Sequence, residues 1–81
     1  MDPKIHLTIK NRESTVFEGD ASSVSSYNDV GPFDILPMHE NFISLIKDKL
    51  IIHSRKEQKE KKIYNGVLKV KDNKVDIYLG L

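Results

Sequence analysis

The stretch GVLKVKDNKVDIYL, residues 66–79, decides the fold class of this sequence. Its second half alternates apolar with polar or aromatic side chains, which is typical of a half-buried β-strand. Its first half is a run of valine, leucine and lysine that also favours a strand. Asp72 and Asn73 stand between the halves, and both residue types tolerate the positive φ of a two-residue turn. The stretch therefore predicts a β-hairpin.

Alternation extends this prediction to the N-terminal third of the chain. Residues 4–10 (KIHLTIK) alternate cleanly, and residues 11–14 are polar and predict a turn. Residues 15–27 continue as strand, with Gly19 inside the pattern, where glycine indicates a bulge or bend. We therefore expect strands on both sides of a bend near Gly19.

The middle of the chain is harder to assign. Residues 28–37 (NDVGPFDILP) predict a loop followed by a short apolar piece, because Pro32 and Pro37 exclude a regular helix and limit any strand to an edge. Residues 41–50 fit helical and strand periodicity equally well. Residues 49–54 read as a β-branched strand.

Residues 55–62 (RKEQKEKK) hold seven charged side chains in eight positions. We interpret them as a solvated hairpin tip or a short charged helical turn. A basic patch for phosphates or anionic lipid is the alternative, although two glutamates interrupt the run.

Composition supports an all-β fold. The 81 residues allow one small domain, and nine isoleucines and six valines stand against a single alanine. We predict one domain over residues 1–81, a small flattened β-sandwich or barrel of about eight to ten short strands. The absence of cysteine excludes disulfides and thiolate chemistry.

Charge is unevenly distributed along the chain. Residues 13–48 hold seven acids and one base, for a net −6, and residues 49–74 hold nine bases and three acids, for a net +6. This asymmetry predicts that the molecule presents one acidic and one basic face.

No catalytic constellation is apparent. The sequence has no nucleophile elbow, P-loop or dinucleotide motif, and its three histidines lack metal-ligand spacing. We expect His39 to hydrogen-bond to backbone rather than to act in catalysis, and Glu18 and Asp20 to be solvated. The sequence therefore predicts no catalytic, metal-binding or cofactor-binding residue.

Residues 31–39 (GPFDILPMH) resemble the G-x-F-G-I-L-P-x-H signature of the ε subunit of F-type ATP synthases, called δ in mitochondria. Four further segments resemble the same family in the same order. They are residues 5–9, 16–24, 66–70 and 73–79.

This resemblance implies a flattened β-sandwich in which residues 41–50 form strand and turn. It implies a non-enzymatic subunit of the rotor's central stalk, with one face on the γ subunit and one end on the polar loops of the c-ring. Such a subunit couples proton flow to ATP synthesis and is peripheral to the energy-coupling membrane, on its cytoplasmic, matrix or stromal side. The family's C-terminal helical pair is not expected, since the chain stops at Leu81.

The resemblance also implies two sets of contact residues. The c-ring set is Val30, Gly31, Pro32, Phe33 and Asp34, and the γ set is His39, Glu40, Asn41 and Phe42. Pro32 stands where the family commonly has an acidic residue, and Asp34 replaces a glycine. Phe33 and Phe42 suit interface anchors and core positions equally well.

Two alternatives have different partners. One is a free-standing β module of the same fold that binds another protein. The other is a small nucleic-acid-binding barrel that uses the basic hairpin at residues 55–62.

Overall fold

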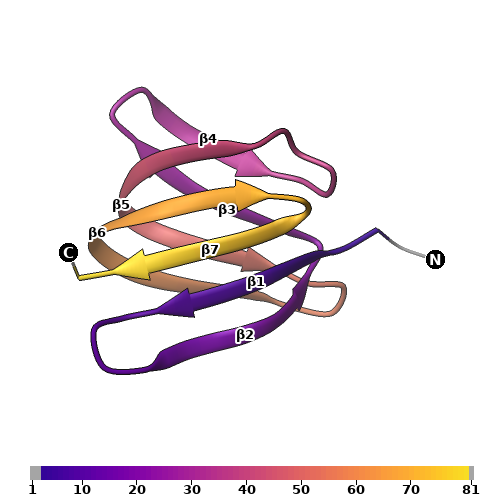
Figure 1. Cartoon of the computed structure of the whole chain (residues 1–81), viewed down its shortest axis with the longest axis horizontal. Helices are drawn as coiled ribbons and strands as arrows, with labels where there is room; N and C mark the ends of the chain where they lie inside the picture. The colour runs from indigo at the N-terminus through magenta and orange to yellow at the C-terminus, as the bar shows by residue number, and fades with distance from the viewer. Residues whose placement is uncertain (1–2, 81) are drawn as a thin grey trace.

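The computed structural model describes residues 3–80, which form seven β-strands and no helix (Figure 1). The strands are β1 (Ile5–Lys10), β2 (Thr15–Ala21), β3 (Ser23–Asn28), β4 (Gly31–Ile35), β5 (Phe42–His53), β6 (Gln58–Lys71) and β7 (Lys74–Leu79). This architecture confirms the all-β prediction.

The strands form one continuous sheet in the order β2-β1-β7-β6-β5-β3-β4. All neighbours are antiparallel except β1 and β7, which run parallel. The sheet doubles over on itself because β5 and β6 form a long ribbon that contributes to both layers (Figure 1). Residues 42–46 and 66–71 lie with β7, β1 and β2, whereas residues 47–53 and 58–63 lie with β3 and β4.

The ribbon folds over at an irregular step in its register. Lys47 pairs with Asn65 and Asp48 pairs with Ile63, so Tyr64 has no residue opposite it and forms a β-bulge. Asp48 of β5 has a φ of 70°, which turns β5 directly beside the bulge in β6. Bulges bend strands and increase their twist, so this step lets one ribbon serve two layers.

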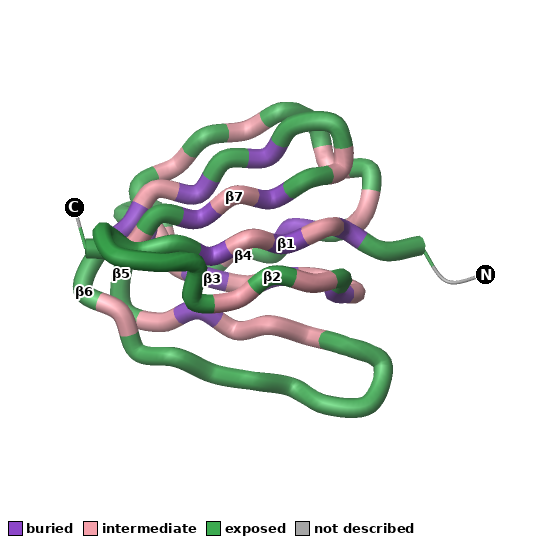
Figure 2. The backbone as a smooth tube through the Cα atoms, turned by 60° about the horizontal axis from the view of Figure 1, so that its bottom comes forward, coloured by how far each residue is buried: buried purple, intermediate pink, exposed green. Residues whose placement is uncertain are grey.

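Every strand contributes at least one buried apolar residue to the core between the layers, and Figure 2 colours the buried positions purple along the backbone. The buried apolar residues are Ile5, Leu7, Ile9, Ala21, Val24, Ile35, Ile46, Leu50, Leu68, Val70, Val75 and Ile77. Ser26 is also buried, and its hydroxyl donates a hydrogen bond to the Lys49 carbonyl at 2.8 Å. A buried hydroxyl with a partner does not carry the cost of an unsatisfied polar group.

Aromatic side chains bridge the places where the two layers meet without backbone pairing. Phe33 of β4 contacts Phe42 of β5 edge to face, with 5.7 Å between ring centroids. At the other side, Lys59 of β6 lies 5.8 Å from the centroid of the Phe17 ring of β2. The sandwich is therefore nearly closed by side chains, although its edge strands remain unpaired.

Most strand predictions are confirmed. Residues 42–53 are strand rather than helix, and the hairpin turn at Asp72 and Asn73 has φ values of 51° and 62°. The described strands number seven rather than eight to ten, because β5 and β6 run on through the fold of the ribbon. The charged stretch is a hairpin tip followed by the start of β6, and not a helical turn.

One local prediction is wrong and another is confirmed. Gly19 pairs regularly with Leu7, and the irregularity between β1 and β2 falls instead beside Ile9 and Lys10. The prediction that the prolines limit any strand here to an edge is confirmed, because residues 31–35 form edge strand β4, which pairs along its length with β3 and holds Pro32 where its missing N–H is tolerated.

Opposed acidic and basic faces remain a prediction. The acidic segment forms β2, β3, β4 and the first half of β5, and the basic segment forms the rest of β5 and β6. Each segment holds an internal ion pair: Lys47 Nζ lies 3.1 Å from Asp29 Oδ1, and Lys49 Nζ lies 3.8 Å from Glu60 Oε1.

Candidate functional site

An exposed apolar row crosses the outer face of the layer that contains β7. Strand alternation turns Ser44 and Ile46 inward, so Ile43 and Leu45 point outward and are 68% and 71% exposed. Leu45 lies opposite Val67 of β6, and Val67 lies opposite Tyr78 of β7. We call Ile43, Leu45, Val67 and Tyr78 the apolar row.

Lysines border the apolar row. Lys69 of β6 lies opposite Ile43, and Lys10 of β1 lies beside Tyr78. Protein interfaces combine an apolar centre with a polar rim, and contiguous exposed apolar side chains mark such surfaces. The apolar row is therefore suited to contact another protein.

The predicted γ set lies at the start of β5, in line with the apolar row. Glu40 and Asn41 are exposed, whereas Phe42 is half-buried and packs against the core. His39 Nδ1 hydrogen-bonds to the Glu40 carbonyl at 2.8 Å, and its ring centroid lies 5.5 Å from that of Phe42. The backbone hydrogen bond expected for His39 is confirmed.

The loop before β5 is held to the β6–β7 turn. Met38 has a φ of 67°, and its N–H donates to Asn73 Oδ1 at 2.9 Å. The same Asn73 side chain donates from Nδ2 to the Lys4 carbonyl at 2.7 Å. One asparagine thus fixes the loop that carries the predicted γ set.

The predicted c-ring set occupies three environments. Val30 stands at the tip of the β3–β4 turn and is 96% exposed, while Phe33 turns inward toward Phe42. Pro32 and Asp34 are exposed on the outer face of β4. Gly31 has a φ of 136°, which favours glycine, and its N–H and that of Val30 donate to Asn28 Oδ1.

Sequence reasoning missed a network of Ser25, Asp34 and His53 on the face that contains β3. The Ser25 hydroxyl donates to Asp34 Oδ1, and His53 Nε2 lies 3.0 Å from Ser25 Oγ. In a hydrolase triad the histidine stands between serine and carboxylate and removes the hydroxyl proton. Here the serine stands in the middle and its proton is held by the carboxylate, so the network ties β4 and β5 to β3.

A second polar cluster joins β1 to β2. His6 Nε2 lies 3.0 Å from Glu18 Oε2, and His6 Nδ1 lies 3.4 Å from Asp20 Oδ1. Hydrogen bonds to Glu18 and to Asp20 raise the pKa of His6 above its ordinary value. The two acids are exposed to solvent, as predicted, and each also lies within hydrogen-bond distance of His6. Among residues 3–80, no group of three or more histidine and acidic side chains is arranged to hold a metal ion.

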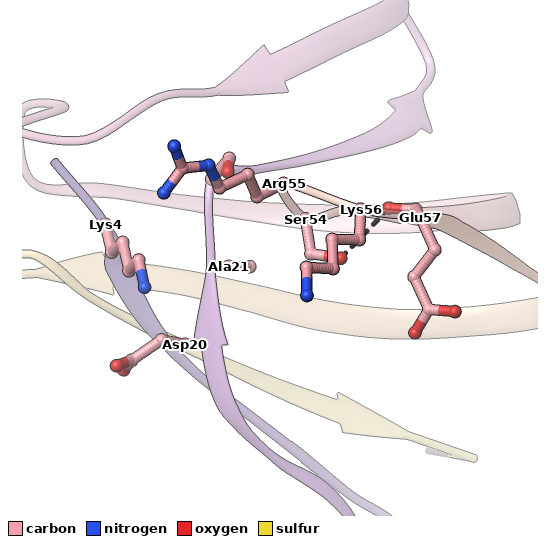
Figure 3. Close-up of a pocket in the computed structure, with 8 residues that line it drawn as sticks. Lys4, Asp20, Ala21, Ser54, Arg55, Lys56 and Glu57 are labelled. Carbon is pink, nitrogen blue, oxygen red and sulfur yellow. Dashed lines mark hydrogen bonds between the residues drawn. The ribbon is translucent and has the colours of Figure 1, made fainter. Parts of the chain in front are cut away.

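A wide hollow of about 540 Å³ lies beside the β5–β6 hairpin tip (Figure 3). Three cationic side chains share its lining with two acids, and they are Lys4, Arg55, Lys56, Asp20 and Glu57. Lys59 Nζ, farther along the hairpin, lies 3.6 Å from Glu57 Oε1. The hairpin is therefore not a patch of one charge sign, which weakens the nucleic-acid alternative.

Residues 4–79 match the family model described as ATP synthase, Delta/Epsilon chain, beta-sandwich domain. The ATP synthase epsilon chain of Campylobacter concisus (strain 13826) is 36% identical over 76 residues, which cover 91% of this chain and 59% of that relative. Among the described residues, no helix is long and apolar enough to cross a membrane.

Solved structures share the fold. One chain of the Euglena gracilis mitochondrial ATP synthase (OSCP/F1/c-ring) superposes with a TM-score of 0.87 at 19% identity, covering 94% of this chain and 50% of that chain. One chain of the Tetrahymena thermophila mitochondrial ATP synthase (central stalk/c-ring) gives 0.78 at 13% identity, covering 96% and 64%. The present chain thus spans between half and two thirds of these relatives.

Proposed function

Because the chain belongs to the delta/epsilon family of ATP synthase subunits through their β-sandwich domain, we propose that it is a non-catalytic subunit of the central stalk. In this role it links the γ subunit to the c-ring of an F-type ATP synthase and couples proton flow to ATP synthesis. It lies peripheral to the energy-coupling membrane through the complex, on the cytoplasmic, matrix or stromal side.

The observation that carries this proposal is the apolar row. Ile43 and Leu45 lie mostly in solvent on a regular strand, where they add little to the core. Burial of apolar surface contributes roughly 25 cal/mol per Å², so these side chains gain their stabilisation only when a partner covers them. We assign the γ subunit to this face.

The predicted γ set extends the same contact along β5. Glu40 and Asn41 are exposed beside Phe42. The half-buried Phe42 ring packs on Phe33 and His39 and supports the backbone that carries the two polar residues. Polar rim residues set register and association rate more than affinity. We therefore propose that Glu40 and Asn41 orient the γ contact that the apolar row stabilises.

The opposite partner, the c-ring, is assigned to the end that carries the β3–β4 turn. Val30 at its tip is available for contact, and Pro32 and Asp34 flank it on the outer face of β4. Phe33 and Gly31 support this end indirectly, through packing and through the turn.

The test is co-purification of the tagged chain in mild detergent from the cells that encode it. Wild-type chain should recover α, β, γ and c subunits at fixed ratio. Leu45→Asp places a charge in the apolar row and should lose γ. The matched control Gln58→Asp places the same charge at an exposed position of β6 in the other layer and should retain it.

Two results would contradict the proposal. Recovery of a soluble partner without ATP synthase subunits would indicate a free-standing binding module of the same fold. Equal recovery of γ by Leu45→Asp and wild-type chain would remove the apolar row from the contact. Circular dichroism of both variants establishes that they are folded.

A further inference from the structure

Among residues 3–80, Tyr64 is the most exposed of the large apolar or aromatic side chains, at 98%. It is the bulged residue at the fold of the β5–β6 ribbon, where no partner lies opposite it. A bulge redirects a side chain that regular pairing would place on one face of the sheet. Here the bulge directs the Tyr64 ring outward into solvent at this end of the sandwich.

The backbone around Tyr64 is held on several sides. The Gly80 N–H donates to the Asn65 carbonyl at 3.4 Å, which ties the bulge to the residue after β7. Gly66 packs so closely on β7 that an added Cβ would lie 2.7 Å from the Tyr78 carbonyl oxygen. Tyr64 is therefore presented from a fixed backbone, which lowers the ordering cost of binding.

Tyr64 and the β3–β4 turn border the same end of the molecule. A hollow of about 260 Å³ lies between them, and its lining includes Asn28, Asp29, Leu45, Lys47, Tyr64 and Asn65. Val30 follows Asp29 at the tip of that turn. The two most exposed apolar or aromatic side chains of the described residues thus flank one hollow.

The charges around the hollow are mixed. Lys47 and Asp29 form an ion pair at 3.1 Å, and on the other side of Tyr64 a second hollow is lined by Asp48, Lys49 and Lys62. Donors and acceptors together suit a polar loop of a protein, whereas an anionic lipid surface attracts patches of one sign. Tyrosine adds a rigid ring and a hydroxyl, the combination found at interface hot spots.

We propose that Tyr64 is the main anchor by which this end of the sandwich rests on the c-ring, with Val30 as the second contact. A polar loop of a c subunit would lie against Asn28, Asp29 and Lys47, whereas Leu45, which also lines the hollow, stays with the γ contact. This inference rests on the proposed function. It adds to the predicted c-ring set a residue from a distant part of the chain, brought there by the fold of the ribbon.

The first experiment places a photo-crosslinking amino acid, p-benzoylphenylalanine, at position 64 of the tagged chain in the assembled complex. Illumination should give an adduct with a c subunit. The same amino acid at position 78, in the apolar row, is the matched control and should give an adduct with γ. An adduct of position 64 with another subunit or with lipid would overturn the inference.

The second experiment compares Tyr64→Ala with Tyr64→Phe. Alanine removes the ring and should lower c-ring recovery about tenfold or more after a salt wash of the chain-bound complex, while phenylalanine should retain most of it. Recovery of γ should stay within about twofold for both, because the apolar row is intact. Equal c-ring recovery by Tyr64→Ala and wild-type chain would overturn the inference.

The two proposals fail differently. Wild-type chain that recovers neither γ nor c-ring contradicts the proposed function, and the inference with it. Wild-type chain that recovers both, but crosslinks from position 64 elsewhere, contradicts only the assignment of Tyr64. Binding of the chain to anionic vesicles without a c-ring, abolished by Tyr64→Ala, would identify lipid as the ligand and overturn the inference as well.

Discussion

The rings of Phe33 and Phe42 meet edge to face, with 5.7 Å between their centroids and 63° between their planes. Each ring belongs to a different predicted contact set, one for the c-ring and one for γ. Their contact joins edge strand β4 to the first half of β5, which have no backbone pairing with each other. The two proposed interfaces are therefore linked through one aromatic pair.

This pair should be energetically coupled. Phe42→Ala should lower the free energy of unfolding by about 2 kcal/mol, less than for a fully buried phenylalanine because Phe42 is half-buried. Phe33→Ala should act similarly, and the double variant should lose about 1 kcal/mol less than the sum. Urea unfolding followed by circular dichroism measures all four proteins. Strict additivity would show that the rings do not interact.

Stability should depend on pH through His6. Its pKa is raised in the folded protein by Glu18 and Asp20, so the imidazole of His6 binds its proton more tightly in the folded state than in the unfolded state. The resulting stabilisation is fully present below the unfolded-state pKa of about 6.5 and is lost as pH rises through the higher folded-state pKa.

Melting temperatures between pH 5 and 9 test this dependence. Wild-type protein should lose stability relative to His6→Gln as the pH rises through that interval. Glu18→Gln should show a weaker dependence than wild type, because the larger of the two contributions is removed. Parallel curves for wild type and His6→Gln would contradict the assignment.

Gly66 should not tolerate a side chain. Its missing Cβ leaves room for the Tyr78 carbonyl oxygen of β7, which would otherwise lie 2.7 Å away. Gly66→Ala should therefore destabilise the protein by about 2 kcal/mol or more, since backbone must move. Gly19→Ala is the matched control: its Cβ would meet the Phe17 ring at 3.5 Å, an ordinary contact, and should change stability by about 1 kcal/mol or less. Similar costs at both glycines would contradict the close approach at Gly66.

Ser25 should contribute to the stability of the fold and not to catalysis. Ser25→Ala removes the hydroxyl between Asp34 and His53 and should cost about 1 kcal/mol. Ser23→Ala, on the same strand, has no such network and should cost less. Thermal unfolding of the two variants measures the difference, and equal costs would show that the network contributes nothing.

Alternation of apolar and polar residues was enough to predict the strands that have one face in water. Residues 5–10 and 74–79 were readable because polar side chains mark their outer faces. Residues 42–46 were not readable from periodicity, because the outward positions Ile43 and Leu45 are apolar too. The apolar row thus obscured the two-residue period, and only the family resemblance indicated a strand.

Features that depend on distant pairing could not be predicted. The bulge at Tyr64 exists because β5 and β6 shift register against each other, and no local signal in its neighbours marks it. Glycine at position 19 suggested a bulge that its regular pairing with Leu7 excludes.

The parallel pairing of β1 with β7 has a consequence for synthesis. The first strand can join the sheet only after the last one has been made, because β7 lies between β1 and β6. A nascent chain still held in the ribosome at residue 70 has a β1–β2 hairpin with no sheet to join. Long-range closure of this kind slows folding and exposes unpaired strand edges. The domain is therefore expected to complete its fold only once β7 has left the ribosome, with β7 as the closing element.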